Sequence, residues 1–431
     1  MRSHPAFHVS FPCPYSCGLF EGGIALMHIC VLGAGIVGLA TARRLQQDGH
    51  RVTVLDHAPA GSGASAANGA QLSYAYVQPL ADPGLWRQLP HLLVSKDSPL
   101  TLRPRWSLDQ WRWGLRFLAA CNADASRRAT AALLELAAES RAAFDELRQQ
   151  ESLDCDFSAH GKLVLYGSAQ GFASAQRQMA LQQSLGVEQR AVSADECLAL
   201  EPALARSRAG IAGAIYTPGE CAADCLKVCL ALEALLLRDG ASRVTASATS
   251  FRLEAGRAVA LVTDAGPLEA DAFVVALGAA SPRLARSVGV YIPVQPLKGY
   301  SITLPLSDAT EDAPLVSVTD ADLKLVYARL GRRLRVAGMA ELGSDGLDVP
   351  KDRIATLLAA TKARFPQAVV DPTACQPWSG LRPATPTGLP LIGSHLRGPC
   401  NVLFNTGHGS LGFTFAFGSA ARVAREVLRI S

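Results

Sequence analysis

Two short apolar runs frame a helical pattern near the start of the chain. Ile29 to Leu32 and Val52 to Leu55 are largely apolar, and the residues between them, up to Gln47, carry apolar side chains at helical spacing. The order strand, helix, strand predicts a βαβ unit with parallel strands.

Later segments follow two different patterns. Residues 129–150 (ATAALLELAAESRAAFDELRQQ) and 174–186 (SAQRQMALQQSLG) space apolar residues as an amphipathic helix does. Residues 300–305, 323–330 and 332–339 (YSITLP, LKLVYARL and RRLRVAGM) instead alternate in short runs. Alternation places side chains on opposite faces of a sheet, so these segments predict antiparallel strands.

Glycines punctuate the first βαβ unit. Gly33 permits a tight turn after the strand, Gly35 lets a pyrophosphate approach the backbone, and Gly38 lets helix and strand pack closely. Asp56 follows the second strand, 56 − 33 = 23 positions after the first glycine, where an acid binds ribose hydroxyls. The motif predicts a dinucleotide site, which Ile36 and Val37 would also line.

The glycine motif alone does not choose between NAD and FAD. Residues 57–78 are turn-rich and small, which suits a loop beneath a flavin, whereas an NAD enzyme would continue with a second nucleotide unit. A further strand starts at Asp271 and ends in Gly278. These features favour FAD. The expected contacts from these segments are Asn68, Gly69, Ala70, Gln71 and Gly278, and Val244 is a further expected contact.

The expected fold is α/β, with a Rossmann-like FAD-binding domain and an interleaved α+β substrate domain containing an antiparallel sheet. Segments 27–90, 205–290 and 376–431 are expected to form the first domain, and 91–204 and 291–375 the second. Residues 1–26 are expected to be a disordered tail or an upstream-start extension.

Composition limits the partners. Of 431 residues, 49% are hydrophobic and the net charge is only +4, which gives no footprint for nucleic acid. No apolar stretch reaches the roughly 18 residues of a membrane-spanning helix. The odd number of cysteines and the absence of CxxC pairs favour reduced thiols and a cytoplasmic location.

Cys221, Cys225 and Cys229 share one spacing along a predicted helix, so they are candidate metal ligands. No histidine accompanies them, and buried thiols are the preferred interpretation, with no metal site.

Residues 103–120 place Trp106, Trp111, Trp113 and Phe117 among arginines. Two interpretations remain open. The helix either packs on the substrate domain, or docks at a membrane surface near a quinone, on the cytoplasmic face of the inner membrane.

A lone arginine stands out in WSGLRPATPTGLPLIGSH, residues 378–395. Arg382 lies between Gly380 and Pro383, and the segment contains no Asp or Glu. A guanidinium can bind both oxygens of a carboxylate, so a ligand from outside the chain is the expected partner of Arg382.

The closing NTGHGSLG precedes an apolar helical run. Backbone N–H groups of Gly407, Gly409 and Gly412 could approach flavin O2 or the pyrophosphate at a helix N-terminus. His408 is either a donor beside the flavin or a cap of the turn.

Several segments together carry a family resemblance. MHICVLGAGIVGLATARRL, AANGAQLSYAYVQPLADPG, PLKGYSITLP, RVAGMAE, WSGLRPATPTGLPLIG and NTGHGSLG resemble the D-amino-acid dehydrogenase small-subunit family. That family belongs to the FAD-dependent oxidoreductases related to D-amino-acid oxidase and glycine oxidase.

The resemblance implies oxidative deamination of D-amino acids to 2-oxo acids and ammonia through an imino acid, with electrons passed to a quinone or another carrier. It places Arg382 at the substrate carboxylate and Tyr300 in the substrate pocket. Tyr327, Tyr74 and Tyr76 are weaker candidates. For each tyrosine, ordinary core packing is the alternative.

Two other functions remain open. One is an amine or imino-acid oxidase that acts on glycine, sarcosine or D-hydroxyproline and uses oxygen. The other is a flavin-binding subunit without catalysis.

Overall fold

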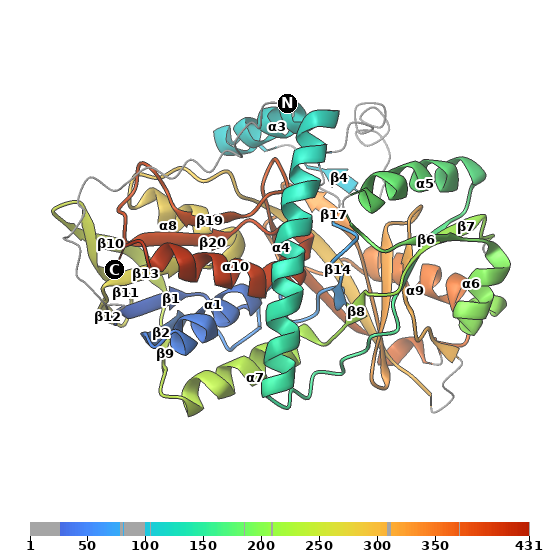
Figure 1. Ribbon diagram of the computed structural model, residues 1–431, viewed down its shortest axis with the longest axis horizontal. Coiled ribbons are helices and arrows are strands. Elements are labelled where there is room, and N and C mark those ends of the chain that lie inside the picture. Colours follow the sequence, from blue (N-terminus) through green and yellow to red (C-terminus); the bar gives the residue numbers. More distant parts are fainter. Residues whose placement is uncertain are drawn as a thin grey trace.

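The structure is a computed structural model that describes residues 26–77, 81, 100–103, 105–184, 186–207, 210–307, 312–369 and 371–430. Residues 1–25 of the predicted tail lie outside these ranges. Figure 1 shows two sheet regions side by side, with the long helix α4 crossing in front of their junction.

A six-stranded sheet forms one region, in the order β19-β20-β13-β1-β2-β9. All neighbours are parallel except β19 and β20. The strands are β1 (His28–Leu32), β2 (Arg51–Asp56), β9 (Ser242–Thr245), β13 (Ala272–Val275), β19 (Leu391–Ser394) and β20 (Val402–Thr406). The apolar residues of the four inner strands β1, β2, β13 and β20 are buried on both faces, as expected for a covered parallel sheet.

Helices cover one face of this sheet and a small sheet covers the other. The helices are α1 (Ile36–Gln47), α4 (Ala123–Gln150), α7 (Cys225–Arg238) and α10 (Gly412–Val427). The opposite side carries α8 (Ser281–Arg286) and the antiparallel strands β10 (Ala248–Glu254), β11 (Arg257–Thr263) and β12 (Gly266–Glu269).

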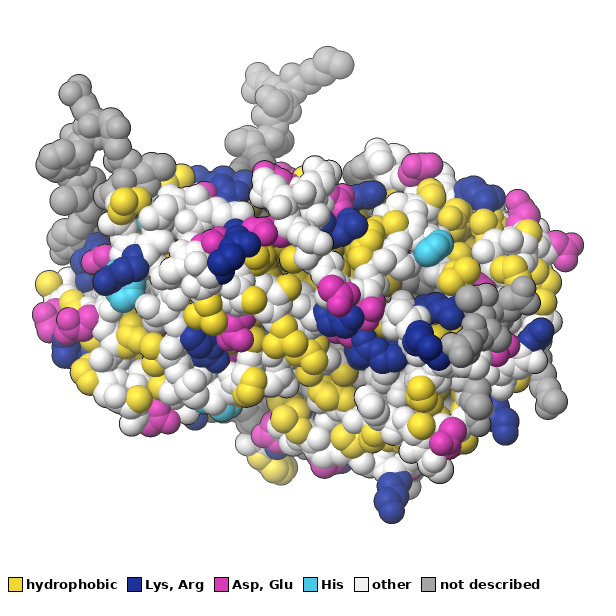
Figure 2. All heavy atoms as spheres, turned by 90° about the horizontal axis from the view of Figure 1, so that it is seen from below, with side chains coloured by type: hydrophobic (Ala, Val, Ile, Leu, Met, Phe, Trp, Pro, Cys, Tyr) yellow, Lys and Arg dark blue, Asp and Glu magenta, His cyan; other side chains and the backbone are white. Residues whose placement is uncertain are grey.

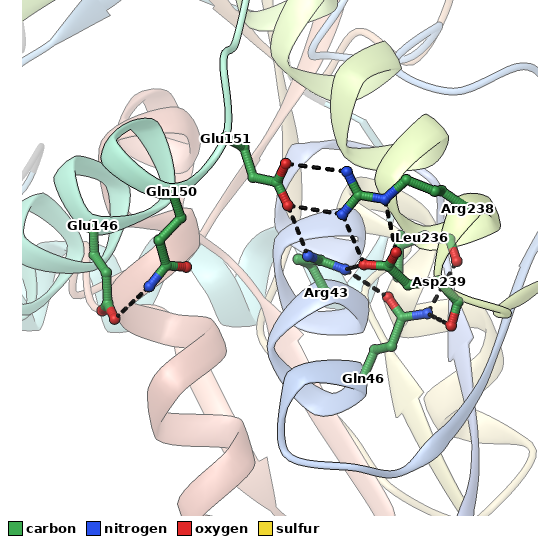
Figure 3. Close-up of polar contacts among 8 residues, drawn as sticks. All are labelled: Arg43, Gln46, Glu146, Gln150, Glu151, Leu236, Arg238 and Asp239. Atoms are coloured by element: carbon green, nitrogen blue, oxygen red, sulfur yellow. Dashed lines mark hydrogen bonds and ion pairs between the residues drawn. The ribbon is translucent and has the colours of Figure 1, made fainter.

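A buried arginine ties three of these helices together. Arg43 on α1 contacts Glu151, directly after α4, at 3.2 Å and Asp239, directly after α7, at 2.5 Å. Arg238 binds the same two carboxylates (Figure 3). The network therefore joins helix ends that are far apart in the sequence.

A nine-stranded sheet forms the second region, in the order β18-β14-β17-β16-β15-β5-β7-β6, with β4 paired to β17. The strands are β4 (Leu100–Leu102), β5 (Lys162–Tyr166), β6 (Arg190–Val192), β7 (Gly213–Thr217), β14 (Gln295–Pro305), β15 (Ser317–Asp320), β16 (Leu325–Leu330), β17 (Arg333–Leu342) and β18 (Gln376–Ala384). The paired strands β3 (Gln71–Leu72) and β8 (Cys221–Ala222) form a separate two-stranded sheet.

The nine-stranded sheet buries one face against helices. This outer face packs on α6 (Ala194–Leu200) and α9 (Lys351–Arg364). Its inner face carries Ser301 on β14 and Arg335 on β17, which bind the carbonyls of Ala67 and Asn68 at 2.6 and 2.9 Å. The helices α3 (Leu108–Ala120) and α5 (Ala169–Gln183) complete the described fold.

The α/β class and the mixture of parallel and antiparallel sheets confirm the predicted fold. Three elements lie elsewhere than the predicted division into domain segments expects. β7 and β18 were expected in the FAD-binding domain but pair within the nine-stranded sheet, and α4 was expected in the substrate domain but packs on α10. A strand pattern does not reveal which sheet receives the strand. The division into two domains stays a prediction.

On the face seen in Figure 2, Lys and Arg side chains are interspersed with Asp and Glu rather than gathered in one field. Among the described residues, no helix is long and apolar enough to cross a membrane.

Candidate active site

Several predicted residues meet at one edge of the six-stranded sheet. The parallel strands β1, β2, β13 and β20 end there, so Gly33, Asp56, Gly278 and Gly407 all lie at this edge. Thr406 Oγ1 donates a hydrogen bond of 3.0 Å to the Gly278 carbonyl, which links two of the turns. Open α/β sheets bind ligands at the carboxyl ends of their strands.

The glycines at this edge fit the roles predicted for them. Gly33 has φ +111°, and a Cβ there would lie 2.5 Å from the carbonyl oxygen of Ala276. A Cβ on Gly38 would lie 1.9 Å from the Gly33 oxygen, so helix and strand allow no side chain. Among the described residues, a Cβ on Gly35 would meet only Ser65 Oγ, at 3.5 Å. Backbone at Gly35 is therefore open to a phosphate, as the FAD pyrophosphate requires.

Asp56 is fixed beside the glycine turn. Its Oδ2 accepts from the Ala34 N–H at 2.7 Å and its Oδ1 from the Ala58 N–H at 3.1 Å. Val244 lies on the adjacent strand, opposite Leu55. A carboxylate held by two amides keeps lone pairs for a ribose hydroxyl.

Ser65 is a residue that sequence reasoning missed. Its Oγ accepts from the N–H of Ile36, the first residue of α1, at 3.1 Å, and the N-cap Gly35 has no side chain to do so. Val37 follows within the same first helical turn. Nothing in the small-residue loop 57–78 marks this serine, because its contact with the helix depends on tertiary structure.

The predicted flavin loop spans the two sheets. Ala70 has φ +59°, and its N–H donates to Asn68 Oδ1 at 2.9 Å. A Cβ on Gly69 would lie 3.0 Å from a valine methyl of β16, so the loop packs tightly on the inner face of the large sheet. Gln71 Nε2 donates to carbonyls on β15 and β16 at 3.2 and 3.3 Å. These contacts attach the loop to the inner face of the nine-stranded sheet.

Arg382 lies on the inner face of β18. On the neighbouring strand β14, a Cβ on Gly299, diagonally across from Arg382, would lie 2.2 Å from its Nη2. Nη1 donates to the carbonyl of Met339 at 2.9 Å. Among the described residues, no carboxylate lies within ion-pair distance of Arg382. Burial lowers the pKa of Arg382 to about 10, so the guanidinium is still charged at neutral pH.

His408 lies between the end of β18 and the edge of the six-stranded sheet that carries the glycine turns. Its backbone bridges to Ala384, two residues beyond Arg382. The side chain is 3% exposed, and its Nε2 has no hydrogen-bond partner among the described residues. Burial lowers the pKa of His408 to about 3, so the imidazole is neutral at pH 7. A buried, unpartnered ring nitrogen fits a bound group that supplies its hydrogen bond.

Three glycines surround this histidine, as the sequence predicts. Gly407 and Gly409 have φ of +84° and +57°, and Gly412 begins α10. The turn from β20 into α10 therefore presents backbone at the same edge as Gly33.

The structure places Tyr300 and Tyr327 apart from Arg382, as the core-packing alternative for these tyrosines predicts. Side chains alternate along β14, so Tyr300 points away from the face that Gly299 shares with Arg382. Both tyrosines are buried in the core beneath α9, where Tyr327 packs on Phe365 at 5.2 Å between ring centroids. Burial raises the pKa of each hydroxyl. Core packing accounts for both residues.

Of the weaker tyrosine candidates, Tyr74 is buried and Tyr76 is half-buried. Desolvation raises the pKa of Tyr74 and of Tyr76, and Tyr76 lies beneath the ammonium of Lys162 at 4.6 Å. Neither contacts Arg382 through any interaction described here.

The cysteine candidates are buried thiols. Burial raises the pKa of Cys221 to about 11 and the pKa of Cys229 well above its usual value. No group of three His, Cys, Asp or Glu side chains in the described part of the chain is placed to hold a metal ion.

The tryptophan-rich segment divides between core and surface. Trp113 is 1% exposed, stacks on Phe117, and donates from Nε1 to the Ala384 carbonyl at 2.9 Å. Trp106 and Trp111 are exposed. The packing interpretation therefore holds for Trp113 and Phe117, which brace the strand that carries Arg382.

A parallel sheet whose glycine turns leave backbone open for a pyrophosphate, beside an arginine that contacts no carboxylate of the described residues, defines a dinucleotide-dependent enzyme. Residues 28–426 match the model of the family described as FAD dependent oxidoreductase. The chain belongs to this family, which confirms the predicted cofactor.

Named relatives and solved structures agree with this assignment. The chain is 49% identical to D-amino acid dehydrogenase 2 of Ralstonia nicotianae over 94% of its length and 97% of that protein. It is 43% identical to D-amino acid dehydrogenase 2 of Pseudomonas aeruginosa, over 93% and 95%. Glycine oxidase from Geobacillus kaustophilus has the same fold, with a TM-score of 0.73 at 22% identity over 93% and 94% of the two chains.

Proposed function

We propose that this enzyme oxidises D-amino acids to 2-oxo acids and ammonia, as a dehydrogenase. The observation that carries the proposal is Arg382, a partly buried cation without a carboxylate partner among the described residues. The names of the relatives at 49% and 43% identity support a D-amino acid as the substrate.

Binding of the substrate and removal of hydride from Cα depend on different groups in the proposed reaction. Arg382 binds the substrate carboxylate and so orients the Cα–H bond. Bound FAD supplies the acceptor for the hydride equivalent that leaves Cα. A substrate that binds with a neutral amine needs no protein base, and the neutral His408 adds no charge to the site. The released imino acid takes up water and yields the 2-oxo acid and ammonia.

The test is flavin reduction by a panel of D- and L-amino acids without oxygen. Arg382→Ala should lower kcat/KM for D-alanine about 30-fold or more, because losing one partner of a desolvated ion pair costs about 2 to 5 kcal/mol. Arg397→Ala removes an exposed arginine and is the matched control. Unchanged turnover in Arg382→Ala, or bleaching by L-amino acids alone, would contradict the proposal.

The electron acceptor is part of the same proposal. A quinone or another carrier, rather than oxygen, is expected to reoxidise the enzyme. Dye reduction without peroxide in air supports a dehydrogenase, whereas stoichiometric peroxide would identify an amine or imino-acid oxidase. A flavin that stays oxidised with every substrate would identify a non-catalytic subunit.

We also propose a cytoplasmic enzyme that makes a peripheral contact with an anionic membrane through α3. Leu108, Trp111 and Leu115 share one face of this helix and are 56 to 75% exposed. Arg112 and Arg116 on the same helix are exposed. Exposed tryptophan and leucine beside arginine suit an anionic lipid surface.

Cosedimentation with vesicles containing phosphatidylserine tests this contact. Trp111→Ser should weaken binding, whereas Leu253→Ser removes an exposed leucine on β10 and should not. Equal binding by both variants would exclude α3 as the contact.

A further inference from the structure

The strand that faces Arg382 contains a β-bulge. Lys298 of β14 pairs with Glu341 of β17, but Tyr300 pairs with Gly338. Gly299 therefore opposes two residues of β17, and Met339 is one of them. Met339 has φ +56°, a left-handed backbone conformation that residues other than glycine rarely adopt.

This conformation turns the Met339 carbonyl toward the arginine. Arg382 Nη1 donates to that oxygen at 2.9 Å, which fixes one edge of the guanidinium. Since a carbonyl carries no net charge, it orients the guanidinium without neutralising it. The cation remains available to a carboxylate.

The backbone of Gly299 lies against the guanidinium of Arg382. A Cβ at this position would lie 2.2, 2.3 and 2.6 Å from Nη2, Cζ and Nη1 of Arg382. No side-chain atom fits there unless the guanidinium moves. The planar group therefore lies directly across the backbone of β14.

Ion pairs anchor the strand beyond the bulge. Glu341, two residues after Met339, is 1% exposed and contacts Arg353 of α9 at 2.9 Å and Arg103 at 3.4 Å. These contacts lie on the outer face, away from Arg382. They fix β17 next to the bulge, where this strand has one residue more than β14.

We propose that Gly299 and the bulged Met339 are positioning residues for Arg382 and set its affinity for the substrate carboxylate. The inference rests on the proposed function, in which Arg382 binds that carboxylate. Bulges recur beside active sites, where they re-aim side chains, and backbone strain is retained where the surrounding structure holds it in place.

The test separates carboxylate affinity from flavin binding. Gly299→Ala and Met339→Val should each raise the KM for D-alanine about tenfold to a hundredfold, because small misplacements of an orienting group have effects of this size. The Kd for propionate, measured by perturbation of the flavin spectrum, should rise in parallel. The FAD content should stay unchanged, and kcat at saturating substrate should fall far less than kcat/KM.

Two further variants exclude a general loss of structure. Met339→Gly accepts the left-handed conformation and should keep the wild-type Kd for propionate, whereas valine is β-branched and resists it. Gly210→Ala adds a methyl group that would meet nothing within 4 Å among the described residues, and it is the matched glycine control.

The outcomes distinguish this inference from the proposed function. If Gly299→Ala and Met339→Val retain FAD and bind propionate like the wild type while Arg382→Ala does not, the positioning role is wrong. If Arg382→Ala also binds propionate normally, the proposed function fails. If Gly299→Ala does not fold, the comparison of Met339→Val with Met339→Gly decides.

Discussion

Replacing His408 should make the enzyme less sensitive to acid. Burial lowers the pKa of this imidazole from 6.5 to about 3. An unfolded chain restores the ordinary pKa, so between pH 6.5 and 3 the unfolded state binds a proton that the folded state refuses. The contribution of His408 to stability is therefore complete above pH 6.5 and declines as the pH falls.

The size of the effect follows from these two pKa values. Integrating the difference in proton binding from pH 7 to pH 5 gives a loss of about 2 kcal/mol in the free energy of unfolding. His408→Asn keeps a polar side chain but does not titrate. Its loss of stability over this range should be smaller than that of the wild type by about this amount.

Urea unfolding at pH 7 and pH 5, in excess FAD and followed by circular dichroism, measures the difference. His160→Asn removes an exposed histidine and should behave as the wild type does. Equal acid sensitivity in His408→Asn and the wild type would refute the reasoning, since it would mean that His408 titrates normally in the folded protein.

Other predictions concern the FAD-binding turns and the tryptophan that packs against β18. Gly38→Ala should yield protein without bound flavin, measured by absorbance, because its Cβ would lie 1.9 Å from the Gly33 oxygen. Asp56→Asn should weaken FAD about tenfold in equilibrium dialysis, as one charge-assisted hydrogen bond is lost. Trp113→Phe should lower the free energy of unfolding by about 1 to 3 kcal/mol, because the Ala384 carbonyl loses its donor; unchanged urea unfolding would contradict this.

The cofactor edge could be predicted from the sequence because its geometry is local. Gly33, Gly35 and Gly38 act within one turn and the helix that follows it, and Asp56 ends the very next strand. Spacing along the chain is enough to bring such residues together.

The surroundings of Arg382 could not be predicted in the same way. Tyr300 lies one residue from Gly299, and only strand pairing determines which of them shares a face with Arg382. A shift of one residue exchanges the two faces of a strand. The bulge at Met339 also leaves no mark in the sequence, since methionine does not favour a left-handed conformation.

The sequence also could not predict which of the two large sheets each strand joins, for a related reason. β18 resembles any other strand with a glycine, yet it pairs with β14 while the following β19 pairs with β20 in the other sheet. The choice depends on contacts made by residues far away in the sequence.

The chain passes repeatedly between its two large sheets, and this threading has a consequence for how the enzyme responds to its cofactor. Neither sheet is built from one continuous stretch, so neither can be excised as an independent folding unit. Binding energy gained at Gly33 is then shared cooperatively by both halves. Protease resistance should accordingly increase at β6, the far margin of the large sheet, when apoenzyme takes up FAD.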